Sequence, residues 1–133
     1  MRIEGLDHVN LRVADPERSL AFYRDVLGLQ PERLEEFRRG ETSLLTLRVN
    51  DGAIVHLRPD QGFEPPPAEE LSSAFDHLAL NVAGSMEDVL AELGRHGIAV
   101  EQEPFDAYGA LGVGPAIYIR DPDGYRVELK ARR

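Results

Sequence analysis

Two histidines stand at equivalent positions in a repeated pattern, and both are candidate metal ligands. Residues 7–14 recur as residues 76–83, with five of the eight residues identical. The repeat matches His8 with His77, and imidazole nitrogens bind divalent transition metals. This spacing suggests chemistry that depends on a metal ion held by two related halves.

A second repeat supplies two further candidate ligands. Residues 48–57 recur as residues 120–129, which matches His56 with Glu128. A duplicated unit with His/His and His/Glu at matching positions predicts one divalent ion shared by all four side chains. Three neutral imidazoles and one carboxylate leave that ion with a net positive charge, which favours oxyanionic ligands.

Composition narrows the classes of function. The chain has 133 residues and no cysteine, so thiolate ligands are excluded and any metal must bind imidazole or carboxylate. A net charge of -9 argues against nucleic acid and anionic membranes as partners. No signal peptide and no apolar run long enough to span a bilayer is present, so we expect a cytoplasmic protein.

The first half has the pattern strand, helix, strand, strand, strand. Its helix is expected to begin with Asp15 as N-cap and Pro16 in the first turn, and to end at Gly28. The expected strands cover residues 3–13, 31–38, 42–49 and 53–58.

The second half repeats this plan. Ser85 and Asp88 form a capping box that begins a helix ending at Gly97, and His96 in its last turn is given no chemistry. The expected strands cover residues 75–83, 99–104, 115–121 and 125–131, with a glycine-rich loop at 109–114. Residues 59–73 contain four prolines and predict a linker.

Strand alternation places the candidate ligands on the more polar face of their strands. Val9, Leu11 and Val13 share one face of the first strand, and His8 lies on the other. The same phase separates His56, His77 and Glu128 from their aliphatic neighbours. Buried imidazole and carboxylate groups cost several kcal/mol unless they are paired or coordinated, so this arrangement favours a metal site.

Other polar residues share these faces. Arg48 and Arg120 are repeat-equivalent, and we interpret them as solvated strand-end residues rather than anion ligands. Tyr118 is matched with Thr46 and is a candidate lining residue. Lys130 lies on the face of Glu128, where we expect an exposed position.

Together these motifs resemble the vicinal oxygen chelate superfamily, which includes glyoxalases, extradiol dioxygenases, fosfomycin-resistance enzymes and bleomycin-resistance proteins. The resemblance covers residues 3–131. Its most specific motifs are Asp7-His8-Val9, residues 22–29, Asp76-His77-Leu78 and residues 121–128.

The resemblance implies an α+β fold in which two βαβββ modules form a cup-shaped mixed sheet around a metal, with helices outside. It implies one domain over residues 1–133. Within that domain the first module covers residues 3–58, the linker residues 59–73 and the second module residues 74–131.

The resemblance also implies roles for the four candidate ligands. His8, His77 and Glu128 match the family's ligands on the first, fifth and eighth strands. The fourth-strand position is a glutamate in many glyoxalases and is His56 here. Glu128 is then the only carboxylate of the four, as ligand, catalytic base or both, and the ion is Fe, Ni, Co, Mn or Zn.

Two functions follow from the resemblance. The first is a divalent-metal-dependent enzyme, a glyoxalase-like lyase or isomerase or an extradiol-type dioxygenase, that acts on a small oxygen-chelating substrate. The alternative is a metal-free protein that sequesters a ligand, as bleomycin-resistance proteins do. A homodimer is expected in either case.

Overall fold

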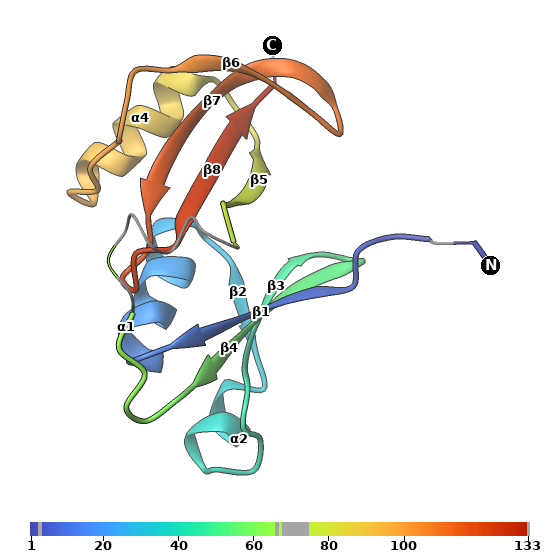
Figure 1. Cartoon of the computed structure of the whole chain (residues 1–133), viewed down its shortest axis with the longest axis vertical. Coiled ribbons are helices and arrows are strands. Elements are labelled where there is room, and N and C mark those ends of the chain that lie inside the picture. The colour runs from blue at the N-terminus through green and yellow to red at the C-terminus, as the bar shows by residue number, and fades with distance from the viewer. Residues whose placement is uncertain (3, 66, 68–74, 133) are drawn as a thin grey trace. The chain divides into compact units, whose positions relative to one another are not determined.

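The computed structural model describes residues 1–2, 4–65, 67 and 75–132 (Figure 1). The chain divides into two compact units, Met1–Pro65 and Pro66–Arg133. The boundary falls inside the predicted linker, of which residues 66 and 68–74 lie outside the described residues. Each unit contains one four-stranded mixed sheet.

The first unit has the strand order β1-β4-β3-β2. Strands β1 and β4 are parallel, and the other neighbouring pairs are antiparallel. Its elements are β1 (His8–Val13), α1 (Pro16–Leu20), a π-helix (Ala21–Val26), β2 (Gln30–Glu32), α2 (Leu34–Arg38), β3 (Leu45–Asn50) and β4 (Ala53–Pro59).

The first helix begins and ends where the sequence predicts. The carboxylate of Asp15 accepts hydrogen bonds from the backbone N–H groups of Glu17 and Arg18 at 3.1 and 3.2 Å, and Pro16 occupies the first turn. The π-helix continues this helix and buries Tyr23 completely. Gly28 follows with a φ of 73°, a left-handed conformation that favours glycine.

The strand predicted over residues 31–38 was wrong for most of its length. Strand β2 ends at Glu32, and residues Leu34–Arg38 form α2. The segment Leu-Glu-Glu-Phe-Arg lacks the alternating apolar pattern of a strand and consists mainly of good helix formers. The strand predicted over residues 3–13 begins only at His8.

The second unit has the equivalent strand order β5-β8-β7-β6, again with a parallel first pair and antiparallel neighbours. Its elements are β5 (Leu78–Val82), α4 (Met86–Arg95), β6 (Phe105–Gly109), β7 (Gly112–Arg120) and β8 (Arg126–Ala131). The predicted α+β fold with two βαβββ modules is therefore confirmed.

Helix α4 has the predicted capping box. The Ser85 hydroxyl accepts a hydrogen bond from the Asp88 N–H, and the Asp88 carboxylate accepts one from the Ser85 N–H, both at 3.1 Å. At the other end Gly97 has a φ of 67°. His96 lies 3.0 Å from a carboxylate oxygen of Glu92 one turn earlier, in agreement with a structural role.

The strand predicted over residues 99–104 was wrong. Strand β6 lies later, and the glycine-rich segment 109–114 is a tight hairpin in which Gly109 pairs with Gly112. Gly114 lies in β7, and a Cβ added to it would lie 2.5 Å from the carbonyl oxygen of Ala131. The glycines thus allow close strand approach rather than forming a long loop.

The burial of alternate residues confirms the predicted strand phase in β1 and β4, whereas β8 is buried on both faces. The buried aliphatic residues include Leu11, Val13, Val55, Leu57, Ile117, Ile119, Val127 and Leu129. Lys130 is also buried, contrary to the expected exposed position. Its ammonium group donates a hydrogen bond of 2.7 Å to the carbonyl oxygen of Gly112, which offsets the cost of burial. No helix among the described residues is both long and apolar enough to cross a membrane.

Candidate metal centre

The first unit brings two predicted ligands together. Strands β1 and β4 are paired so that Asn10 lies opposite His56, which puts His8 diagonally across from His56 on the polar face. The two imidazole rings have centroids 5.1 Å apart at an interplanar angle of 64°. The phase argument from sequence is therefore correct for this pair.

Each of these imidazoles has an oxygen neighbour at Nδ1. His8 Nδ1 lies 2.5 Å from a carboxylate oxygen of Asp7, and His56 Nδ1 lies 2.9 Å from the Thr46 hydroxyl. With its proton on Nδ1, each ring keeps the Nε2 lone pair for a metal. Burial, followed by the nearby His8, lowers the pKa of His56, which favours the neutral form that binds metals.

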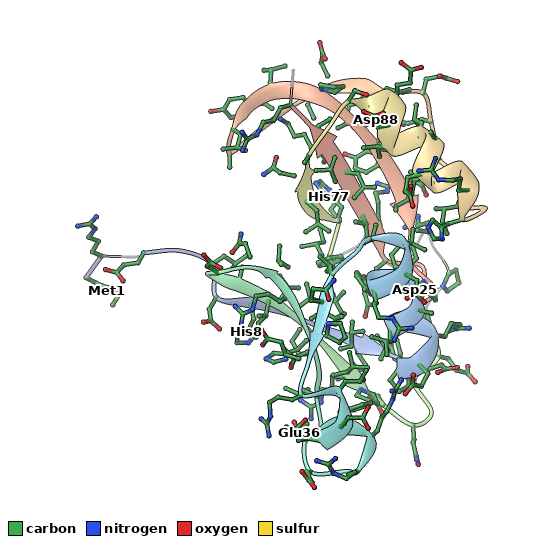
Figure 2. The ribbon with its side chains drawn as sticks, turned by 180° about the vertical axis from the view of Figure 1, so that it is seen from behind. Met1, His8, Asp25, Glu36, His77 and Asp88 are labelled. Atoms are coloured by element: carbon green, nitrogen blue, oxygen red, sulfur yellow. The ribbon has the colours of Figure 1, made fainter. Side chains whose placement is uncertain are left out.

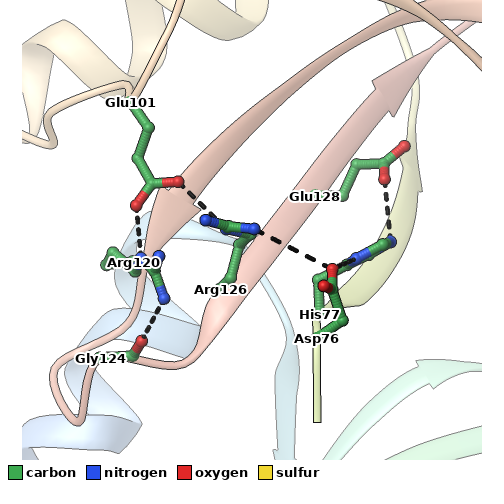
Figure 3. Close-up of polar contacts among 7 residues, drawn as sticks. All are labelled: Asp76, His77, Glu101, Arg120, Gly124, Arg126 and Glu128. Carbon is green, nitrogen blue, oxygen red and sulfur yellow. Dashed lines mark hydrogen bonds and ion pairs between the residues drawn. The ribbon is translucent and has the colours of Figure 1, made fainter. Parts of the chain in front are cut away.

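The second unit contains His77 (Figure 2) and brings it together with Glu128 (Figure 3). His77 directly precedes β5, and its Nε2 lies 3.1 Å from a carboxylate oxygen of Glu128 on β8. His77 Nδ1 lies 2.5 Å from Asp76, which repeats the Asp7–His8 contact of the first unit. The exposed fraction of Glu128 is only 6%.

Tyr118 on β7 completes the surroundings of this second pair. It lies opposite Glu128 in the strand register. Its ring centroid is 5.5 Å from that of His77. Burial, followed by the charges of Glu128 and Asp76, raises the pKa of Tyr118, so the phenol stays protonated.

Thr46 and Tyr118 occupy equivalent positions in the two units. Thr46 lies opposite His56 in the register of β3 and β4, as Tyr118 lies opposite Glu128. Each places a hydroxyl group beside the ligand on the neighbouring strand. Sequence reasoning matched the two residues but did not find this role, because it requires the cross-strand register.

Arginines at equivalent positions of β3 and β7 form an ion pair in each unit. Arg48 contacts the carboxylate of Glu32 at 2.7 and 3.1 Å, and Arg120 is hydrogen-bonded to Glu101. Both arginines are thus paired with carboxylates instead of being merely solvated. Glu32 and Glu101 are 69 residues apart, the offset of the first repeat, and that signal could have predicted the pairing.

Arg126 extends this network only in the second unit (Figure 3). Its Nε lies 3.2 Å from Glu101 and its Nη1 4.0 Å from Asp76. Its guanidinium carbon lies 4.9 Å from the centre of the Tyr118 ring. An ion-paired chain therefore runs from Glu101 through Arg126 to the aspartate beside His77.

The donor sets within each unit suit a divalent metal. Nitrogen and oxygen ligands about 2.0–2.2 Å from one ion lie roughly 3 Å apart, close to the separation of His77 Nε2 and Glu128. Within the described ranges, no three His, Cys, Asp or Glu side chains form a metal-binding group. The structure brings His8 to His56 and His77 to Glu128, and the four-ligand centre stays a prediction.

Comparison with known families identifies the superfamily of the chain. Residues 5–129 match the family model of the Glyoxalase/Bleomycin resistance protein/Dioxygenase superfamily. The chain belongs to this superfamily. The match spans both repeats, so the sequence resemblance to the vicinal oxygen chelate proteins is confirmed.

Relatives within the superfamily are similar along nearly the whole chain. The chain is 30% identical to a lactoylglutathione lyase of Salmonella typhimurium over 125 residues, which cover 92% of this chain and 88% of the relative. It is 30% identical to the virulence protein STM3117 of the same organism over 129 residues, covering 97% and 85% of the two chains.

Solved structures of the superfamily share the fold. The crystal structure of STM3117 matches with a TM-score of 0.72 at 27% identity and covers 100% of both chains. A glyoxalase/dioxygenase from Nostoc punctiforme matches with a TM-score of 0.79 at 24% identity, covering 96% of this chain and 90% of the other.

Proposed function

We propose that this chain is a divalent-metal-dependent enzyme that acts on a small oxygen-chelating substrate. His8, His56, His77 and Glu128 would hold the ion. The observation that supports the proposal is the matched geometry of the two units, in which two ligand-type side chains lie together and each histidine has an oxygen partner at Nδ1. Such outer partners orient metal ligands and fix histidine tautomers.

The ion, when bound, would act as a Lewis acid that polarises substrate oxygens. The three imidazoles would bind in their neutral forms, and Glu128 would be the only negative ligand. The site would then keep a positive charge that attracts an enediolate or a similar oxyanion. The protonated Tyr118 phenol lies opposite Glu128 and would hold that carboxylate in place while it acts as ligand or base.

Among the reactions of the superfamily we favour a glyoxalase-like lyase or isomerase over a dioxygenase. Several relatives about as similar as the virulence protein are named lactoylglutathione lyase. His56 occupies the position of a glutamate in many glyoxalases, which suggests a related reaction on another substrate. We also expect a cytoplasmic homodimer, which size measurement in solution would test.

The proposal predicts loss of metal in a ligand variant. The full-length chain, purified without chelators, should contain stoichiometric divalent metal by elemental analysis. His77→Ala should lose most of it, because a nitrogen ligand next to Glu128 is removed. His96→Ala is the matched control and should keep the metal, since the His96 ring lies 3.0 Å from Glu92 at the end of α4 and is not among the proposed ligands.

Two outcomes would contradict this function. Full metal retention in His77→Ala would exclude His77 as a ligand. A wild-type chain that takes up no Fe, Ni, Co, Mn or Zn would instead favour the metal-free sequestering protein. Turnover of lactoylglutathione with each metal then tests whether the lyase activity named for the relatives extends to this chain.

A further inference from the structure

The two units differ in one cation beside their equivalent aspartates. Position 126 is arginine in the second unit, and the repeat-equivalent residue of the first unit is Ile54. Arg126 Nη1 lies 4.0 Å from a carboxylate oxygen of Asp76. An isoleucine side chain cannot pair with Asp7, so the repeat is symmetric in its ligand-bearing positions but not in this charge.

Arg126 is held in place from two further sides. Its Nε lies 3.2 Å from Glu101, whose other carboxylate oxygen binds Arg120. Its guanidinium carbon lies 4.9 Å from the centre of the Tyr118 ring, a stacking distance for a cation over an aromatic face. A planar guanidinium with both restraints has little freedom to move.

Asp76 has few restraints of its own. Its side chain is 64% exposed, yet it holds His77 Nδ1 at 2.5 Å. An exposed aspartate rotates readily about its side-chain bonds unless a partner fixes it. Arg126 is such a partner, because it lies close to the same carboxylate oxygen that contacts His77.

We propose that Arg126 is a positioning residue, which orients Asp76 and thereby keeps the His77 ring beside Glu128 and Tyr118 before any metal binds. In the first unit the position of Arg126 is taken by Ile54, so Asp7 lacks this partner, although Arg48 acts on Asp7 electrostatically. The two halves of the candidate centre would then be unequal, with the second unit preorganised to receive the ion first. The consequence for metal binding depends on the proposed function, whereas the orientation of His77 does not.

The orientation can be measured by NMR on the metal-free, full-length chain. Wild type should show a nuclear Overhauser contact between the ring protons of His77 and Tyr118, whose centroids are 5.5 Å apart. Arg126→Met keeps part of the stem and removes the charge, and it should lose this contact. Glu101→Gln removes the anchoring carboxylate and should weaken the contact as well, which keeps the test decisive if Arg126→Met does not fold.

Arg48→Met is the matched control. It breaks the repeat-equivalent ion pair with Glu32 and should leave the His77–Tyr118 contact unchanged. Arg126→Lys retains a cation without the planar fork and should restore the contact in part. In the same experiment the affinity for Zn²⁺ or Co²⁺ should fall about tenfold in Arg126→Met, which is the lower end of the effect of outer-sphere partners.

An unchanged ring contact in folded Arg126→Met and Glu101→Gln would overturn the positioning role. Equal loss of the ring contact in Arg48→Met would also overturn the positioning role, because removal of an unrelated ion pair would then have the same effect. If the wild-type chain binds no metal and the ring contact is nevertheless lost in Arg126→Met, the proposed function is refuted and this inference stands.

Discussion

Each candidate ligand has an oxygen-bearing neighbour that orients it. Asp7, Thr46 and Asp76 contact His8, His56 and His77 directly, and Tyr118 lies opposite Glu128 in the strand register. Two neighbours precede their ligand directly in sequence, and two lie across a strand pair. The aspartates could be recognised within the repeat, whereas the hydroxyl partners required knowledge of the strand register.

Thr46→Val tests an outer contact at nearly constant volume. Removing the hydroxyl leaves His56 Nδ1 without its partner at 2.9 Å, so the ring loses its fixed orientation. We expect the affinity for a divalent metal to fall about tenfold, measured by titration calorimetry.

Thr42→Val serves as the control for this substitution, since the Thr42 hydroxyl accepts a hydrogen bond from the Leu44 N–H at 3.5 Å and, among the described residues, has none with a candidate ligand. Equal affinity in Thr46→Val and wild type would show that Thr46 does not orient His56.

At the scale of elements, local signals near the chain's turns proved reliable. Asp15 and Ser85 cap their helices as predicted, because capping depends on side chains within three residues of the helix start. The strands predicted over 31–38 and 99–104 were wrong. Short strands depend on pairing with distant neighbours, which a local pattern does not contain.

Ser85→Ala tests the contribution of the capping box to stability. The variant loses the hydroxyl that accepts from the Asp88 N–H, and we expect the free energy of unfolding to fall by about 1 kcal/mol. Urea denaturation measures this change. Ser85→Thr retains the hydroxyl and should differ little from wild type.

The same box predicts a pH dependence. Hydrogen bonds from Ser85, first from its side chain and then from its backbone, lower the pKa of Asp88 below its ordinary value of 3.8. The native state therefore binds this proton less readily than the unfolded state, and the stabilisation is present above pH 3.8 and lost as the pH falls. Acid titration of stability should be less steep in Ser85→Ala, and identical slopes would contradict the assignment.

At the scale of the whole molecule, the function that we propose depends on the duplication of one structural unit. Both units have the same strand order, and each contributes two adjacent ligand-type residues. A single ion bound by all four side chains would couple the stability of the two units.

Hydrogen exchange tests this coupling. At a free metal concentration 100-fold above Kd, bound ion should stabilise the folded chain by about 2.7 kcal/mol. Amide exchange should therefore slow in β1 and β4 as well as in β5 and β8, and His77→Ala should abolish the effect in both units. Slower exchange confined to one unit would show that its ligands act alone and that the four-ligand centre is wrong.

The sequence by itself determined the repeat, the α+β module order, the ligand-bearing strand faces and the superfamily. The repeat, the module order and the strand faces follow from periodicity and spacing, which occur locally and twice in the chain, whereas the superfamily rests on the resemblance of its motifs. Only the tertiary structure decided which residues of other strands lie beside the ligands. Buried Lys130 and the chain of contacts from Glu101 to His77 depend on strands that meet across many residues, because side-chain neighbours are set by register and packing rather than by order in sequence.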